Sequence, residues 1–291
     1  MFRWLAVSLL LIATGQVNAL ELNSRFTQGD IIIGTAIPGT QLVLDGKPVR
    51  VSPDGAFVFG FDRDAPTAAQ LQITYPDGRR ETRNLTIQTR RYDVQRIDGL
   101  PPKKVTPPKK VLERIGRESK QVAQARTQDF TTPYFLSGFR WPVQGRISGV
   151  YGSQRILNGE PRRPHYGVDV AAPVGTPVRA PADGVVTLTH PNMYFSGGTL
   201  ILDHGHGLSS SFLHLQKIHA KEGQAVKQGD VIATVGATGR VTGAHLDWRM
   251  NWFKERVDPD RVGTSNALKC SFSSVKGCGR TDRITLRIIN T

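Results

Sequence analysis

The chain has 291 residues, of which 38 are Lys or Arg and 24 are Asp or Glu, so its formal net charge is +14 at pH 7. Hydrophobic residues make up 38% of the sequence, which is too large a share for an intrinsically disordered chain. No apolar run approaches the length of a membrane-spanning helix, which excludes a multispan membrane protein. The 30 Gly and 18 Pro indicate many turns and therefore short strands.

Residues 1–19 have the pattern of a secretory signal peptide. Arg3 supplies a positive charge, residues 4–13 form an apolar run, and residues 17–19 suit a cleavage site. The alternative is an uncleaved segment that tethers the protein to a membrane. We predict an exported protein, periplasmic or extracellular, whose mature form has no stable membrane span. Its basic charge then favours anionic envelope polymers over nucleic acid as partners.

Residues 20–98 contain short apolar or alternating runs separated by turn sequences such as Asp45-Gly46. The runs are residues 31–33, 41–44, 56–61, 71–75 and 84–89. This spacing predicts a small antiparallel β-sandwich. The pattern resembles the Ig-like accessory domains of secreted bacterial proteins, which implies a spacer or polymer-binding role.

Residues 99–132 are predicted to connect this sandwich to a second domain. Residues 101–110 read Pro-Pro-Lys-Lys-Val-Thr-Pro-Pro-Lys-Lys, which predicts a stiff linker in extended polyproline geometry. Leu112, Ile115, Val122 and Ala125 then recur near helical spacing, so one amphipathic helix is expected within residues 111–129.

Residues 133–262 are predicted to form an all-β domain. The expected strands are residues 178–180, 184–189, 199–202, 209–215 and 231–235, with glycine-containing turns between them. Residues 263–291 form a C-terminal tail containing Cys270 and Cys278. In an oxidising compartment, two cysteines most simply form one disulfide.

All seven histidines lie between His165 and His245. His165 and Asp169 are four residues apart in a segment that favours extended structure, so both can point to one face and share an ion. An imidazole nitrogen and a carboxylate oxygen are an ordinary partial ligand set for zinc. Taken alone, this pair is a weak signal.

Two further clusters lie downstream. Alternation in the expected strand places His214 on the same face as Phe212, where a structural, partly buried histidine is an equally open interpretation. His245 and Asp247 are two apart and should point to the same side. Arg240 precedes them and could hold a substrate carboxylate or pair with Asp247.

In this order, the clusters resemble the motifs of the lysostaphin/LytM-type zinc metallopeptidases of bacterial cell walls. Residues 172–178, 180–186, 223–232 and 257–259 resemble further segments of that family. The resemblance covers residues 133–262 and implies a LytM-like antiparallel β-sheet catalytic domain. The whole chain is therefore expected to be all-β, with the sandwich, the linker and one helix before that domain.

By this resemblance, His165 and Asp169 match two zinc ligands, and His214 and His245 match the two catalytic histidines. The third zinc ligand of the family is normally a histidine, and Asp247 occupies its position here. A second carboxylate offsets more of the ion's charge, so the bound water should be less acidic. The site could be active but retuned, could prefer another divalent metal, or could be inactive.

Two turn histidines, His204 and His206, could in principle supply the missing imidazole, although histidines in turns are usually exposed. In the expected mechanism, three ligands leave one metal position for water. His245 is our choice for the general base, and His214 would donate a hydrogen bond to the oxyanion.

The resemblance implies an exported endopeptidase that holds one Zn²⁺ ion and cuts peptide bonds of peptidoglycan, in the stem peptide or the cross-link. The alternative is a degenerate binding module that docks on peptidoglycan or activates another wall hydrolase. A third interpretation is an envelope β-protein whose histidines are incidental.

Overall fold

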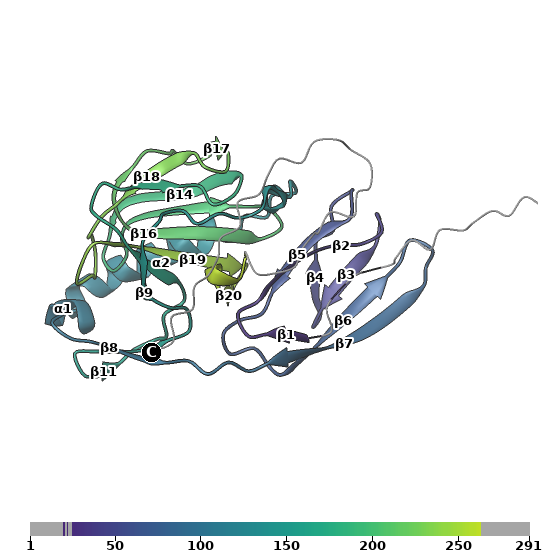
Figure 1. Ribbon diagram of the computed structural model, residues 1–291, viewed down its shortest axis with the longest axis horizontal. Coiled ribbons are helices and arrows are strands. Elements are labelled where there is room, and N and C mark those ends of the chain that lie inside the picture. The colour runs from purple at the N-terminus through teal and green to yellow at the C-terminus, as the bar shows by residue number, and fades with distance from the viewer. Residues whose placement is uncertain (1–19, 21, 23–24, 263–291) are drawn as a thin grey trace, which may run out of the picture.

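The computed structural model describes residues 20, 22 and 25–262 (Figure 1). The expected signal peptide at residues 1–19 and the expected disulfide between Cys270 and Cys278 lie outside the described residues. Strands dominate the described chain, which confirms the all-β class predicted from the sequence. Within the described part, no helix combines the length and the apolar character that a membrane crossing requires.

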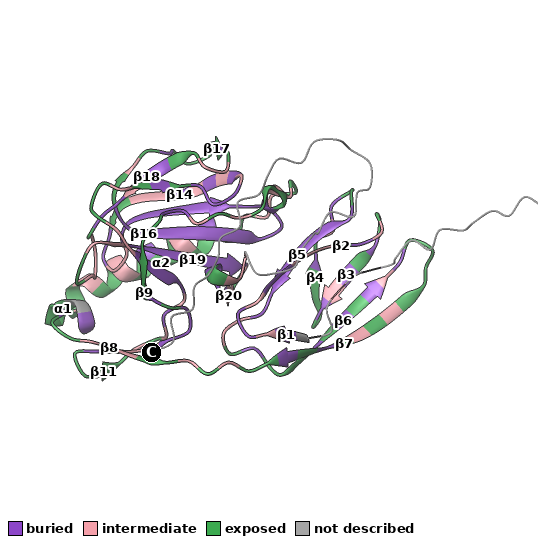
Figure 2. Cartoon of the chain, viewed as in Figure 1, coloured by how far each residue is buried: buried purple, intermediate pink, exposed green. Residues whose placement is uncertain are grey.

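The N-terminal part is built from two sheets, one with the strand order β1-β7-β6-β3-β4 and one that pairs β2 with β5. The strands are β1 Arg25–Thr27, β2 Ile31–Thr35, β3 Gln41–Leu44, β4 Lys47–Val49, β5 Ala56–Gly60, β6 Ala68–Thr74 and β7 Arg80–Gln88. β6 alternates exposed and buried residues, whereas β5 is buried along its whole length (Figure 2). A strand with one buried face alternates exposed and buried residues, as β6 does. β5 is covered on both faces, so all of its residues are buried. The Ig-like resemblance of this part stays a prediction.

Most of the connecting segment between Pro102 and Ala125 is helical. It contains α1 Pro102–Val105, the 3₁₀ turn η1 Lys109–Val111 and α2 Leu112–Ala125. The prediction of an extended polyproline linker was therefore wrong for Pro102–Val105 and for the turn that begins at Lys109, whereas Pro108 between them has extended geometry, with φ = −66° and ψ = 150°. Proline is compatible with the first helical turn, and Val105 is buried against Leu100 and Leu157. Burial of this valine favours a compact turn over a solvated extended chain.

Helix α2 agrees closely with the expected amphipathic helix. Val122 and Ala125 pack on Leu188, Met193 and Ile201 of the large sheet. Its N-terminal Leu112, by contrast, is exposed. Apolar packing therefore holds the C-terminal end of the helix on the large sheet, and the buried Glu118 in its middle accepts a 2.8 Å hydrogen bond from the Tyr194 backbone N–H.

The large sheet has the order β17-β14-β15-β16-β19-β12-β9, with β13, β18 and β20 attached off this path. Its strands are β9 Arg146–Gly149, β12 Val168–Ala171, β13 Pro177–Arg179, β14 Gly184–Met193, β15 Gly197–Asp203, β16 Leu208–Ile218, β17 Ala225–Val226, β18 Val231–Val235, β19 His245–Trp252 and β20 Glu255–Val257. Short 3₁₀ turns, η2 Tyr134–Ser137 and η3 Pro259–Arg261, flank it. β16 and β19 are buried along most of their length, as expected for central strands (Figure 2).

A three-stranded sheet links the two parts of the chain. It contains β8 Val94–Ile97, β10 Gln154–Leu157 and β11 Glu160–Pro161 in the order β11-β10-β8. β8 lies inside the expected sandwich segment but pairs in parallel with β10 of the following domain. The chain therefore joins the second domain before the expected boundary at residue 98.

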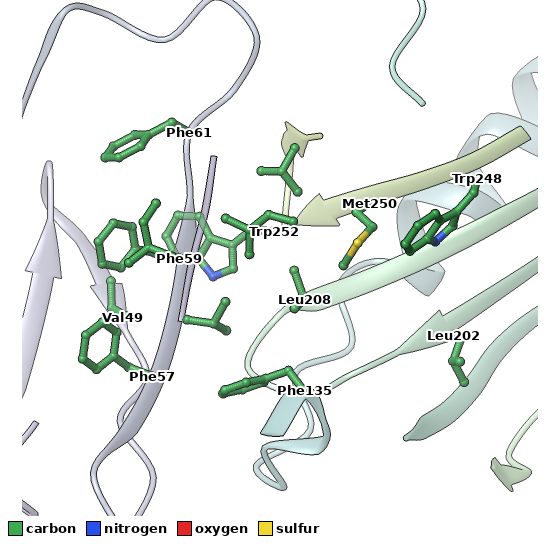
Figure 3. Packing of buried hydrophobic residues seen from close by; sticks show 14 of the residues in the cluster. Val49, Phe57, Phe59, Phe61, Phe135, Leu202, Leu208, Trp248, Met250 and Trp252 are labelled. Atoms are coloured by element: carbon green, nitrogen blue, oxygen red, sulfur yellow. The ribbon is translucent and has the colours of Figure 1, made fainter. Parts of the chain in front are cut away.

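The N-terminal sheets and the large sheet share one continuous apolar core (Figure 3). Phe59 on β5 meets Trp252 on β19 with ring centroids 6.5 Å apart. Both side chains are buried, with 0% and 2% of their surface exposed. An ion pair of Arg90 with the buried Asp258, 2.7 Å apart, adds a polar contact between the two parts.

Candidate active site

The three predicted metal ligands meet on one face of the large sheet. In the antiparallel pairing of β12 with β19, Asp169 lies directly opposite Asp247, and Ala171 lies opposite His245. His165 precedes β12 on the adjoining loop. One ligand atom from each of His165, Asp169 and Asp247 lies within 4.8 Å of the others, and all three residues are buried. Among the described residues, no other group of three or more His, Cys, Asp or Glu side chains has the geometry to hold a metal ion.

The polar atoms of this cluster suit a cation between them. His165 Nε2 and Asp169 Oδ1 lie 3.0 Å apart, yet neither finds a hydrogen-bond partner among the described residues. Buried polar atoms are normally paired, so such atoms need an explanation. Two ligands of one tetrahedral zinc ion lie about 3.3 Å apart, and zinc accepts both imidazole and carboxylate. The residues present therefore fit a zinc-sized divalent cation.

Each carboxylate of the cluster also forms an ion pair with an arginine. Arg155 Nη2 donates to Asp169 Oδ2 at 2.6 Å, and Arg249 donates to both oxygens of Asp247, with Nη2 to Oδ2 at 2.6 Å. Burial raises the pKa of each aspartate, but His165, ahead of Arg155, lowers that of Asp169 and Arg249 lowers that of Asp247, so both pKa values lie below the usual range. Both carboxylates are therefore ionised and ready to bind a cation.

The two predicted catalytic histidines lie beside this cluster. Their rings are 4.9 Å apart between centroids. His245 Nε2 is 3.8 Å from Asp169 Oδ1, and His214 Nε2 is 4.0 Å from Asp247 Oδ2. The structure thus brings together all five residues that the sequence motifs singled out.

Hydrogen bonds fix the tautomer of both rings. His214 Nδ1 lies 2.8 Å from the carbonyl oxygen of Thr238, and His245 Nδ1 lies 2.9 Å from that of Gly243. A carbonyl only accepts, so Nδ1 carries the proton and the neutral ring presents an Nε2 lone pair. Burial also lowers the pKa of His214 to about 4, which keeps this ring neutral near pH 7.

The backbone at His214 departs from the expected alternation. Leu213 pairs with Asp247 and Phe212 pairs with Trp248, so Phe212 faces the core rather than the metal ligands. His214 has φ = 65°, in the left-handed region, where the usual alternation of side chains breaks down. The expectation that His214 shares the face of Phe212 was therefore wrong. The strained residue instead turns its ring toward Asp247.

Comparison with known proteins identifies the family. The model of Peptidase family M23 matches residues 163–259. A solved structure from Pseudomonas aeruginosa that is named for peptidase M23 superposes with a TM-score of 0.63 at 30% identity, covering 81% of this chain and 94% of that one. The chain belongs to peptidase family M23. The family resemblance drawn from the sequence is thereby confirmed.

Two curated relatives come from Vibrio cholerae. Peptidoglycan DD-endopeptidase ShyA is 41% identical over 114 residues, or 38% of this chain and 26% of the relative. Peptidoglycan DD-endopeptidase ShyB is 44% identical over 142 residues, or 47% of this chain and 30% of the relative. The aligned part of the chain therefore spans less than a third of each relative.

Two glycines that the sequence analysis did not single out make room for the carboxylates of the cluster formed by His165, Asp169 and Asp247. A Cβ on Gly149 would lie 2.3 Å from Asp169 Oδ2, and a Cβ on Gly167 would lie 2.5 Å from Asp247 Oδ1. Neither approach is tolerable between non-bonded atoms. Gly167 lies two residues before Asp169, but its closeness to Asp247 depends on the pairing of β12 with β19.

Arg155 and Arg249 are the other site residues that sequence reasoning missed. The signal for Arg249 is present, since it follows Asp247 by two residues on the same strand face. Arg155 comes from β10, and local sequence carries no signal for its contact with Asp169. Arg240, which was expected either to hold a substrate carboxylate or to pair with Asp247, lies over the Phe195 ring at 4.6 Å, and both alternatives stay predictions.

His204 and His206 do not complete the metal cluster. The expectation that they are exposed was wrong, because both are buried. His204 contacts the Asp183 carbonyl and Ser210 Oγ, both at 2.8 Å, and His206 contacts the Thr131 carbonyl at 3.0 Å. Their hydrogen bonds account for them as structural residues, and Asp247 remains the third ligand candidate.

Proposed function

We propose that this chain is an exported, metal-dependent endopeptidase that hydrolyses peptide bonds of peptidoglycan, in the stem peptide or the cross-link. The observation that carries the proposal is the buried cluster of one imidazole and two carboxylates, with two histidine Nε2 atoms beside it. M23 membership and the names of the two Vibrio relatives support the choice of substrate. Peptidoglycan lies outside the cytoplasm, which agrees with the signal pattern at residues 1–19.

The proposed cofactor is one Zn²⁺ ion held by His165, Asp169 and Asp247. When bound, zinc lowers the pKa of its water and polarises the scissile carbonyl. The chain's own contribution is a preorganised set of ligands. Arg155 and Arg249 hold the two carboxylates in place, and fixed outer partners of this kind normally support metal affinity.

The two histidines are proposed to move the proton. Each presents Nε2 as an acceptor, so each can take a proton from the attacking water and return it to the leaving amine. His245, whose side chain is 17% exposed against 7% for His214, is the proposed base because it is the more open to an incoming substrate. A neutral His214 has no Nε2 proton to give, so the expected donation to the oxyanion would require its protonated form.

Metal content and hydrolysis together test this proposal. We expect the purified protein to bind about one equivalent of zinc per chain, measured by elemental analysis after dialysis. His165→Ala and Asp247→Ala should each lose this zinc. His219→Ala is the matched control, because His219 is an exposed histidine outside the cluster. A wild-type protein that binds no divalent ion, or a His165→Ala variant that retains full zinc, would refute the metal site.

A second candidate is a module that binds peptidoglycan without cutting it. The observation that favours it is Asp247, which replaces the usual histidine and has both oxygens bonded to Arg249. Digestion of purified peptidoglycan followed by mass spectrometry separates the candidates. New peptide termini that depend on His245 support the enzyme, whereas unchanged muropeptides with retained binding support the module.

A further inference from the structure

A cavity of about 590 Å³ opens beside His165 and His214. One wall comes from the connecting helices, through Val105, Ile115 and Ser119. These residues lie at least 36 positions upstream of every other residue that lines the cavity. The connecting segment therefore closes one side of the space next to the candidate metal ligands.

Arginine dominates the lining of this cavity. The six guanidinium groups belong to Arg155, Arg162, Arg163, Arg240, Arg249 and Arg256. None of the described residues that line the cavity is Asp or Glu. Asp169 and Asp247 pair with two of the six arginines at 2.6 Å. Glu160 Oε2 also lies 3.7 Å from Arg162 Nη1, so six guanidinium groups stand against three nearby carboxylates and positive charge is in excess.

Two of these arginines are held in place by aromatic rings. The Arg240 guanidinium lies 4.6 Å from the Phe195 ring centroid, and the Arg240 backbone N–H donates to the Phe195 carbonyl at 2.8 Å. Arg256 lies over Tyr166 at 4.1 Å. Stacking occupies the face of a guanidinium, while its hydrogen bonds are made in its plane. Both side chains are therefore preorganised for planar recognition.

Charge crowding and burial act together on this cluster. Burial is the largest cause that lowers the pKa of Arg240, to about 10, and Arg155, Arg249 and Arg162 lower it further. Arg162 Nε is buried and has no hydrogen-bond partner among the described residues. Buried donors without partners and mutually repelling cations are both relieved by an anion.

We propose that this cavity is a carboxylate-binding subsite, in which Arg240 and Arg162 hold a free carboxylate of the peptide substrate next to the scissile bond. This inference rests on the proposed function. A guanidinium matches a carboxylate through two parallel hydrogen bonds. The apolar Val105 and Ile115 suit the small aliphatic side chains of a short peptide better than a large polyanion.

The test is binding of two peptides that differ by one charge. The probes are acetyl-L-lysyl-D-alanyl-D-alanine and its C-terminal amide, titrated calorimetrically into the chelator-treated full chain. We expect the free acid to bind wild type about tenfold more tightly than the amide, since hydrogen bonds to charged groups contribute on this scale. In Arg240→Gln and in Arg162→Gln this ratio should fall toward one.

Arg80→Gln is the matched control, because it removes the same charge from an exposed position on β7 in the N-terminal part. It should retain the full preference for the free acid. Equal affinity of wild type for the two peptides would overturn the inference, as would a preference that persists in both arginine variants. Failure to bind either peptide would also count against it.

The outcome is separable from that of the proposed function. A protein that prefers the free acid but never cuts peptidoglycan would refute the endopeptidase and leave the subsite standing. A protein that cuts peptidoglycan but shows no preference would refute the subsite alone.

Discussion

Arg249 holds Asp247 through three contacts from a position two residues further along the same strand. Nε lies 3.0 Å from Oδ1 and 3.1 Å from Oδ2, and Nη2 lies 2.6 Å from Oδ2. Asp247 itself lies opposite Asp169 across the strand pair. Without a cation, two facing carboxylates repel each other. Arg249 and Arg155 therefore stabilise the cluster in the absence of metal.

Substituting Arg249 should make the stability of the fold depend on bound metal. We expect Arg249→Met to lower the free energy of unfolding by about 2 kcal/mol in chelator, because the buried Asp247 charge loses its partner. Added zinc supplies positive charge at the same carboxylate, so its increase in Tm should be larger for the variant than for wild type. Thermal unfolding with chelator and with zinc measures both effects.

Arg83→Met provides a control with the same geometry. Arg83 pairs with Glu81 two residues away on β7, but that carboxylate is 38% exposed. Loss of this ion pair should lower the free energy of unfolding by less than about 1 kcal/mol, and the Tm of the variant should not respond to zinc more than that of wild type. An Arg249→Met variant that behaves like this control would contradict the role assigned to Arg249.

Space for the ligand carboxylates depends on glycine. In Gly167→Ala the added Cβ would lie 2.5 Å from Asp247 Oδ1 and 2.7 Å from the Trp248 carbonyl oxygen. We expect Asp247 to be displaced and zinc affinity to fall by about 10- to 100-fold, as for other disturbances of ligand orientation. Competition with a zinc chelator measures the change. Gly116→Ala, whose Cβ meets nothing within 4 Å, should leave zinc affinity unchanged.

The histidine pair should affect hydrolysis without affecting metal content. His214→Ala and His245→Ala are each expected to lower kcat by about 10²- to 10⁴-fold, the usual contribution of acid–base catalysis. Both variants should keep about one zinc per chain, because the ligand set is His165, Asp169 and Asp247. Muropeptide release and elemental analysis on the same samples check both statements. Loss of zinc from either variant would instead make that histidine a ligand.

Stability should depend on pH through Asp203, which lies apart from the metal cluster. Burial, with a smaller contribution from Asp129, raises the pKa of Asp203 to about 7. Between about pH 4 and pH 7 the folded protein keeps a proton that the unfolded chain releases. The contribution of Asp203 to the free energy of unfolding should therefore fall as pH rises through this range, by at most about 4 kcal/mol, whereas the buried His204 and His214, whose pKa values are lowered to about 4, contribute in the opposite direction.

Asp203→Asn should remove this contribution, so the test is the difference in stability between the variant and wild type at each pH. An asparagine oxygen can still accept the 2.7 Å hydrogen bond from the Gly205 N–H. We expect the variant to exceed wild type in stability at pH 8 and to match it near pH 4, measured by urea unfolding in chelator. The exposed Asp54→Asn is the control and should follow wild type. Parallel curves for wild type and Asp203→Asn would refute the prediction.

The shared core should make the two β-rich parts unfold together. Phe59 is fully buried and packs on Trp252 of the large sheet. Phe59→Ala should cost about 3–5 kcal/mol, the usual effect of deleting a buried aromatic ring. Val174→Ala, at an exposed position, should change stability by less than about 0.5 kcal/mol. Calorimetry also reports cooperativity, and we expect the single wild-type transition to broaden or split only in the Phe59 variant.

Much of the site could be predicted from local patterns. Strand periodicity placed His245 and Asp247 on a common face, and it also paired His165 with Asp169, although His165 lies on the loop before β12. Within one strand or helix, the side chains point outward at a fixed repeat. The relative directions of side chains that are close in sequence can therefore be predicted without knowledge of the fold. Family motifs then related these pairs to His214. The helix within residues 111–129 was predicted from its apolar spacing for the same reason.

The remaining features depend on contacts between residues distant along the chain. Asp169 faces Asp247 because of the register of β12 with β19, and Arg155 reaches Asp169 from β10. The left-handed backbone at His214 reverses the direction that simple alternation assigns to its ring. Ile115 of α2 forms part of the cavity wall because the connecting segment folds back over the large sheet. Register, backbone strain and docking of helices are set by packing over the whole fold, so no local stretch of sequence specifies them.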